Sequence, residues 1–175
     1  MAKNRLFPAL ASLTLAASLA ACGGEAPTET AEDTMTEDAA PMDVAEMEPE
    51  AIVKARHDNF EEIGDAFKAI RGELEGSEPD YTKIATQAQI IDTNAGKVGD
   101  YFPEGTGPDA VKTEALATIW EKPEEFSAAV DKLTTASAAL LTAANASDAA
   151  AVSAGVKELG SSCKNCHDQF REEDD

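Results

Sequence analysis

Apolar residues recur at intervals of three and four through most of the chain after Pro49, and this period constrains the fold more than any other feature. Gly and Pro interrupt it only at long spacings. The first such stretch predicts a helix that starts at Pro49 or Glu50 and stops near Gly76. Its apolar stripe consists of Val53, Phe60, Phe67 and Leu74, which are seven apart, with Ile63 and Ile70 between them.

Three further long helices are expected from the same period. The second runs from about Asp80 to Gly99, Pro123 opens the third, and Ser147 or Asp148 caps the fourth. Their predicted core residues are, in order, Tyr81, Ile84, Ala88, Ile91, Ala95 and Val98; Phe126, Val130, Leu133, Ser137, Leu140 and Ala144; Val152, Val156, Leu159, Cys163 and Phe170.

A loop, FPEGTGPDA, and a short helix around Val111 to Trp120 are expected between the second and third of these helices. No segment alternates apolar and polar residues as a strand would. The pattern therefore predicts an all-α protein, an antiparallel four-helix bundle, over residues 50–175. Several inward positions are alanine and aromatic residues make up only 5% of the chain. Such a core either packs its helices closely or surrounds something that is not protein.

The N-terminus has the order of an export signal. Lys3 and Arg5 precede an uncharged apolar run, and Leu-Ala-Ala-Cys ends at Cys22. The run is too short for a comfortable membrane span. Residues 1–21 are thus predicted to be a signal peptide, and the cysteine resembles the lipidated first residue of bacterial lipoproteins. The alternative is ordinary cleavage, which would leave a soluble periplasmic protein.

Residues 22–49 form an acidic segment without a helical period. Gly23 to Glu50 contains acids and no base, so the segment is expected to be a solvated, disordered tether between lipid and folded domain. The formal net charge of the whole chain is −20. This charge disfavours nucleic acid and anionic lipid surfaces as partners, which leaves the lipid anchor as the expected contact with the membrane.

The pentapeptide CKNCH, Cys163 to His167, holds two of the three cysteines and one of the two histidines. C-x-x-C-H is the attachment motif of c-type haem. Its two thiols bond to the two vinyl groups on one edge of the porphyrin, and the adjacent imidazole binds the iron. On a helix, the three residues share a face. We therefore predict one covalent haem c, held by Cys163 and Cys166, with His167 as an axial iron ligand.

Three other interpretations of the motif are weaker. A redox-active dithiol is expected in a βαβ setting, which the sequence lacks. A zinc site needs four ligands, and only His57 or carboxylates are at hand to complete it. Chance spacing at a helix end is the third alternative.

Arg56 occupies a position on the stripe that otherwise holds Ile63 and Ile70, so it is expected to point inward. A buried guanidinium without a partner costs several kcal/mol, so an anionic group such as a haem propionate should meet it. The alternative is that the side chain reaches outward or pairs with a neighbouring Glu.

The sequence resembles the class II c-type cytochromes, the cytochrome c′ family, over about residues 50–173. The resemblance is carried by CKNCHDQFR (163–171), RHDNFEEIG (56–64) and YFPEGTGPDAVKTEALATIWEKPEEF (101–126). It implies a four-helix bundle with thioether bonds at Cys163 and Cys166 and a proximal iron ligand at His167. It further implies that Arg171, Arg56 and Trp120 lie close to the haem, and that the protein forms a homodimer through its first two helices.

The resemblance also bears on the sixth coordination position of the iron. Low-spin members of the family have a methionine four residues after the equivalent of Arg56, whereas this chain has Phe60. Phe60 cannot ligate iron, which favours five-coordinate iron with an apolar distal pocket. His57 replaces a glutamine that contacts a propionate in many members, and it is the alternative sixth ligand.

The leading hypothesis is therefore a periplasmic-face haem protein, without enzymatic activity, that binds NO, CO and similar small gases. A second hypothesis is an electron carrier that serves unidentified redox partner proteins, with either five-coordinate iron or low-spin iron ligated by His57. A third is a haem-free interaction module on a lipid anchor.

Overall fold

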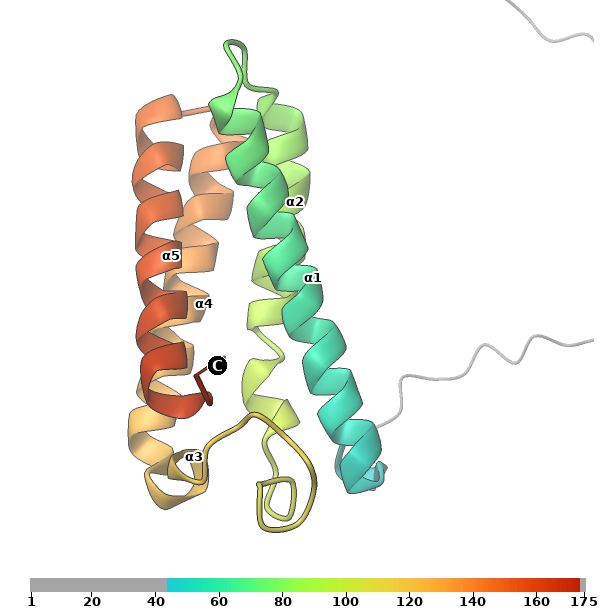
Figure 1. Ribbon diagram of the computed structural model, residues 1–175. Helices are drawn as coiled ribbons and strands as arrows, with labels where there is room; N and C mark the ends of the chain where they lie inside the picture. Colours follow the sequence, from blue (N-terminus) through green and yellow to red (C-terminus); the bar gives the residue numbers. More distant parts are fainter. Residues whose placement is uncertain (1–43, 174–175) are drawn as a thin grey trace, which may run out of the picture. The chain divides into compact units, whose positions relative to one another are not determined.

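The computed structural model describes residues 44–173, which form a helical bundle (Figure 1). The predicted signal peptide, Cys22 and most of the predicted tether lie outside the described residues. None of the helices within residues 44–173 is long and apolar enough to cross a membrane. The helices, in chain order, are the 3-10 helix η1 (Val44–Glu46), α1 (Pro49–Glu75), α2 (Tyr81–Ala95), the 3-10 helix η2 (Val98–Tyr101), α3 (Thr118–Glu121), α4 (Pro123–Asn145) and α5 (Ala149–Phe170).

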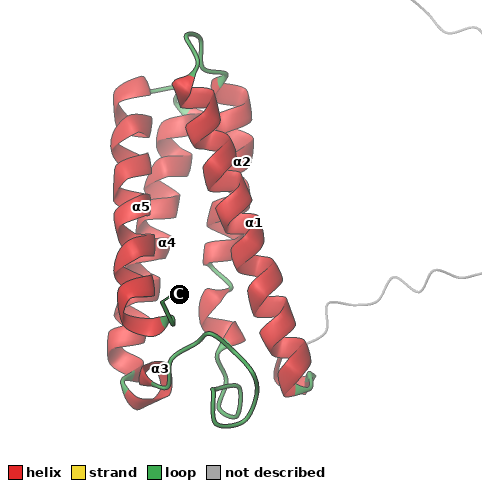
Figure 2. Ribbon diagram, in the orientation of Figure 1, coloured by secondary structure: helices red, strands yellow, loops and turns green. Residues whose placement is uncertain are grey.

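The four long helices α1, α2, α4 and α5 run antiparallel along the bundle, so the predicted fold class is confirmed (Figure 2). Two short connections, 76–80 and 146–148, lie at one end, which we call the turn end. The opposite end carries the loop 102–117, α3 and the last turns of α5. Because the cysteine motif is in α5 near this opposite end, we call it the cysteine end.

Local signals define where the helices begin. Pro49 and Pro123 occupy the first turns of α1 and α4, where the missing N–H leaves no bond unmade. Asp80 caps α2 by accepting from the amides of Thr82 (2.9 Å) and Lys83 (3.3 Å). Asp148 rather than Ser147 caps α5, accepting from the amides of Ala150 and Ala151, both at 3.0 Å.

The core is built from aliphatic residues and alanines. Its largest fully buried apolar side chains are Ile70, Ile84, Ile91, Leu140, Leu159, Val98 and Val152. Most predicted core positions are buried, but the stripe of α1 is centred one residue away from the expected line. Val53, Phe60, Phe67 and Leu74 are only half-buried, and the fully buried line of this helix is Ile52, Arg56, Asn59, Ile63, Ala66 and Ile70.

Two predicted helix boundaries are wrong. The second long helix ends at Ala95 instead of about Gly99, because the amide of Lys97 bonds to the carbonyl of Asn94 (3.1 Å) and the chain tightens into η2. The short helix predicted around 111–120 is reduced to Thr118–Glu121. Residues 111–117 bond to distant groups instead of to their own helix: the amide of Leu116 donates to the carbonyl of Phe170, and that of Glu172 donates to the carbonyl of Glu114.

Candidate haem site

The cysteine motif lies in the last two turns of α5. Cys163 and Cys166 are free thiols, half-buried and packed against the hydrophobic core. His167 follows directly, with an exposed side chain that has an interaction of its own. The structure therefore places all three residues on one helix at the spacing that the sequence predicts.

Burial changes the chemistry of the two thiols. It raises the pKa of the Cys166 thiol to about 11, with a further contribution from Cys163. Burial also raises the pKa of Cys163. Both sulfurs are thus held in the protonated form near neutral pH. This is the reverse of the lowered pKa that activates a redox dithiol.

The zinc interpretation gains no support either. Within residues 44–173, no group of three or more His, Cys, Asp and Glu side chains is placed to hold a metal ion. His57, which would have to complete such a site, has an exposed side chain on α1.

Arg56 is buried, 5% exposed, so its predicted inward direction is confirmed. Its guanidinium holds the loop that follows η2. Nε donates to the carbonyl of Tyr101 (2.9 Å), Nη1 to Oγ1 of Thr113 (3.2 Å), and Nη2 to Oγ1 (2.7 Å) and the carbonyl (3.3 Å) of Thr106. Burial lowers the pKa of Arg56 to about 10. All these partners are neutral oxygens, so the expected anionic partner stays a prediction.

Phe102 is the centre of an aromatic cluster that sequence reasoning missed. Its ring lies under the Arg56 guanidinium, 4.1 Å from Cζ to centroid. The centroid of the Phe102 ring lies 4.8 Å from that of Phe126, 6.1 Å from that of Trp120 and 6.4 Å from that of Phe60. Its position directly after η2, at the start of a Gly/Pro-rich loop, is the signal that marks it in the sequence.

The aromatic cluster extends to the cysteine helix through Phe170. Its ring meets that of Phe126 edge to face, with centroids 5.4 Å apart. Phe170 stands four residues after Cys166, on the same side of α5. Phe60, Phe102, Trp120, Phe126 and Phe170 therefore connect α1 to the helix that carries both thiols.

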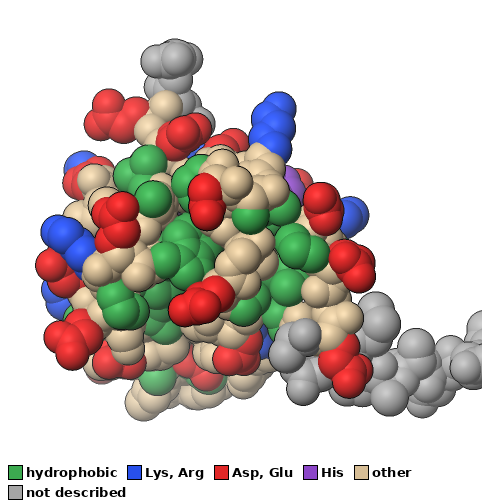
Figure 3. All heavy atoms as spheres, turned by 90° about the horizontal axis from the view of Figure 1, so that it is seen from below, with side chains coloured by type: hydrophobic (Ala, Val, Ile, Leu, Met, Phe, Trp, Pro, Cys, Tyr) green, Lys and Arg blue, Asp and Glu red, His purple; other side chains and the backbone are tan. Residues whose placement is uncertain are grey.

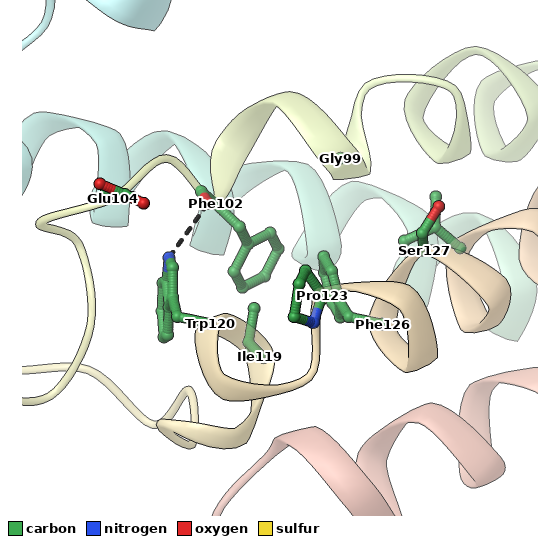
Figure 4. A pocket seen from close by; sticks show the side chains of 9 residues that line it. Gly99, Phe102, Glu104, Ile119, Trp120, Pro123, Phe126 and Ser127 are labelled. Atoms are coloured by element: carbon green, nitrogen blue, oxygen red, sulfur yellow. Dashed lines mark hydrogen bonds between the residues drawn. The ribbon is translucent and has the colours of Figure 1, made fainter.

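Beside these rings lies a cavity of about 410 Å³ (Figure 4). Phe102, Ile119, Trp120, Pro123 and Phe126 line most of it, and Glu104 lies at its edge. The indole Nε1 of Trp120 donates to the carbonyls of Phe102 and Pro103, both at 3.1 Å. Trp120 thus closes the cysteine end as an aromatic plug while lining the cavity.

Arg171 lies just beyond the end of the cysteine helix. α5 ends at Phe170, and Arg171 is its C-cap residue with extended backbone, so it is not on the helix face that carries His167. Its Nε donates to Oε2 of Glu114 at 3.1 Å, and its backbone forms an isolated bridge with Ala115. This bridge ties the end of α5 to the loop that covers the cysteine end.

Comparison with known proteins identifies the family. The sequence model described as "Cytochrome C'" matches residues 51–171. The chain belongs to the cytochrome c′ family. It is 39% identical over 124 residues to cytochrome c′ of Pararhodospirillum photometricum, a match that covers 71% of this chain and 98% of that protein.

Solved structures of cytochrome c′ have the same fold. The structure from Rubrivivax gelatinosus is 30% identical, covers 72% of this chain and 98% of its own, and has a TM-score of 0.67. A nitric oxide complex of a mutant cytochrome c prime from Alcaligenes xylosoxidans is 25% identical, covers 73% and 98%, and also has a TM-score of 0.67.

Membership of the cytochrome c′ family implies covalently bound haem c, and the residues present fit that group. Two free, protonated thiols stand one turn apart and pack against the hydrophobic core, which includes the rings of Phe126 and Phe170. Next to Cys163, the hydroxyl of Ser162 is buried and has no hydrogen-bond partner among the described residues. A buried polar atom without a partner is costly, and its position beside the thiols fits a site that a further group completes.

Proposed function

We propose that this chain is a mono-haem c-type cytochrome of the periplasmic face that binds small neutral gases such as NO and CO and carries single electrons. The observation that carries the proposal is the arrangement of Cys163, Cys166 and His167 in α5, next to an aromatic cluster that includes Phe60. In this role Cys163 and Cys166 form the two thioether bonds and His167 ligates the iron. When bound, haem c supplies an iron that takes up a gas and exchanges one electron.

The distal side of the site depends on Phe60. Phe60 is half-buried and packs edge to face on Phe102. Within residues 44–173 the only methionine is Met47, which precedes α1. We therefore propose an apolar distal wall that offers no ligand to the iron and excludes water. Small neutral gases enter such a pocket at lower desolvation cost than polar ligands do.

The arginines orient the group. In the proposed holoprotein, Arg56 holds the loop through Nε and Nη2 and also contacts a haem propionate. Arg171 lies near the haem as well. His57 takes part at the propionate edge and not at the iron. We further propose that the chain has no catalytic residues of its own, that residues 1–21 direct export, and that Cys22 carries a lipid anchor.

A second function, electron transfer through six-coordinate low-spin iron, would require His57 to reach the iron. Its exposed position on α1 does not favour this. The homodimer through α1 and α2 stays a prediction; Ile90 on α2 is a large apolar side chain that is 36% exposed.

The test is a set of visible spectra of the full chain expressed in a host that attaches haem c, oxidised and reduced, with and without CO and NO. We expect covalent haem with a high-spin spectrum that changes on adding either gas. A low-spin spectrum without a response to CO would contradict the five-coordinate proposal, and His57→Ala would then identify the sixth ligand. The matched control is Cys163→Ala with Cys166→Ala, which should contain no covalent haem.

A further inference from the structure

The cysteine end presents apolar patches with acidic side chains around and among them, which we call the acidic rim (Figure 3). The loop 102–117 and α3 supply much of this surface. Phe102, Pro103, Leu116 and Trp120 are only partly buried there, and Pro123 at the start of α4 is exposed. Phe102, Trp120 and Pro123 of this surface also line the cavity (Figure 4).

Most basic side chains at this end are already neutralised by ion pairs. The pairs are Lys54 with Asp58, Lys122 with Glu125 (3.3 Å), Lys164 with Asp168 (2.6 Å) and Arg171 with Glu114 (3.1 Å). A carboxylate that is paired with a cation contributes little to the field that an approaching molecule meets.

The remaining acidic residues at this end are exposed and have no ion pair with another described residue. They include Glu48, Glu50, Asp100, Glu104, Asp109, Glu121, Glu124, Glu172 and Glu173. On the basic side, Lys112 has no ion pair with another described residue, and Arg56 is buried and bonds to neutral oxygens. The rim therefore carries an excess of negative charge. Its carboxylates flank the apolar surface directly, because Glu104 borders the cavity and Glu121 follows Trp120.

We propose that the cysteine end docks a protein partner whose own contact surface has an apolar centre and a rim of lysine and arginine, and that one electron passes between the two proteins there. The proposal deepens the electron-carrying part of the proposed function and rests on it. One electron leaves the reduced haem of this chain and reduces the oxidised centre of the partner; no bond forms and no proton moves. The apolar centre excludes water on contact, and the rim steers the approach.

The charge of the acidic rim is complementary to that of the proposed partner. A negative rim attracts a positive one over about one Debye length, roughly 10 Å at 0.1 M ionic strength, and repels a second copy of this chain. Steering of this kind raises the association rate and leaves a dependence on salt.

The probe for the test is mitochondrial cytochrome c, a small and strongly basic electron-carrier protein. Its association with the full-length holoprotein is measured by calorimetry with both proteins oxidised, so that no electron moves. Stopped-flow spectroscopy then gives the rate at which the reduced holoprotein reduces the oxidised probe. The variant is Glu104→Lys with Glu121→Lys; the matched control, Glu75→Lys with Glu78→Lys, makes the same change of net charge at the turn end.

We expect the cysteine-end variant to lower the association constant and the rate roughly tenfold at low salt, with the difference lost as salt screens it. The turn-end variant should change both by less than about twofold, because its charges lie outside the contact. Equal effects of the two variants would overturn the proposal. So would self-association of the wild-type chain that responds to Glu104→Lys, which would make a second copy the occupant of this surface.

Failure of the proposed function gives a different result. In that case the wild-type chain would contain no covalent haem, and the visible spectrum reports this before any partner is added. The electron-exchange part of the proposal would then be overturned, while the calorimetric difference between the two variants would still decide whether the surface docks a basic protein.

Discussion

The two ends of the bundle are built on different principles. At the turn end, Ile70, Ile84, Leu140 and Val152 are completely buried, and Asp80 and Asp148 cap the helices that start there. At the cysteine end, α1 and α4 start with proline and have no side-chain cap. The interior there contains five aromatic rings, of which Phe60, Phe102 and Trp120 are partly exposed. Close packing at the turn end stabilises the fold, whereas the cysteine end leaves two thiols, a cavity and a buried cation available for a ligand.

Close packing at the turn end has a visible cause in sequence. Gly155 of α5 faces Leu140 of α4, and a Cβ at this glycine would lie 3.3 Å from the Leu140 Cα. The two helices approach closely because no side chain separates them. At the cysteine end, the absence of a side chain at Gly107 lets the loop approach Trp120, since a Cβ there would lie 3.1 Å from the indole.

The largest change in stability is expected from a substitution in the core of the turn end. Leu140→Ala should lower the free energy of unfolding by about 3 kcal/mol, because the side chain is fully buried and its neighbours cannot fill the cavity. Urea denaturation of the holoprotein measures this loss, and its haem spectrum should not change. Leu141→Ala, a half-buried neighbour on the same helix, is the control; an equal loss there would contradict the distinction between the two ends.

The next largest change in stability is expected from a substitution of Arg56 at the cysteine end. Arg56→Lys should lower the free energy of unfolding by about 2 kcal/mol, since the buried cation stays while the fork that meets Tyr101, Thr106 and Thr113 is lost. Hydrogen exchange should become faster in the loop 102–113 and stay unchanged at the turn end. The control, Arg71→Lys on the exposed side of α1, should have almost no effect on either measurement.

The raised thiol pKa values predict a pH dependence confined to the chain before haem attachment. The pKa of Cys166 is about 11 in the fold against a reference of 9.0, so the folded state keeps a proton that the unfolded state loses. Its contribution to stability is present below pH 9 and is lost as the pH rises toward 11, a loss of about 2 kcal/mol.

This loss is measured by urea denaturation of the haem-free chain between pH 8 and about 11. The holoprotein, whose thiols are consumed in the proposed thioether bonds, should show no such step. The haem-free Cys166→Ala variant should keep only the contribution of Cys163, whose pKa burial also raises. A step of equal size in that variant would assign the effect to another group.

The smallest expected effect concerns helix capping at the turn end. Asp148→Ala should lower the free energy of unfolding by about 1 kcal/mol, because the amides of Ala150 and Ala151 lose their acceptor. Thermal denaturation followed by circular dichroism measures the shift. Asp131→Ala, an exposed position inside α4, should be close to neutral, and a similar loss there would contradict the capping role.

The difference between the ends also explains what the sequence could predict. The four long helices depend on local signals: a period of three and four, Pro at the starts of α1 and α4, and Asp at the caps of α2 and α5. These signals placed α1, α4 and α5 within a residue or two. The CKNCH motif was equally readable, because its chemistry requires residues that are adjacent in the chain.

Interactions between distant residues were not readable in the same way. Residues 111–117 have an apolar pattern suited to a helix, yet Thr113 bonds to Arg56, and Glu114 and Leu116 bond to the end of α5. The part of Phe102 in the site was missed for the same reason, since its ring acquires neighbours only when α1, α3 and α4 meet. Arg56 was found because a charge on an apolar stripe is visible within one helix, although its neutral loop partners were not.

The hydrogen bonds between the segment 114–116 and residues 170–172 have a consequence for the order of assembly. α1, α2 and α4 precede the cysteine motif in the chain and can pair as they emerge, whereas the contact of the segment 114–116 with α5 forms only when residues 170–172 arrive. Arg56 and Trp120 can hold the rest of the loop earlier, so this contact is the last to fasten the cover of the site. A bulky group can reach Cys163 and Cys166 most easily before this contact forms, while α5 has not yet packed against the other three long helices.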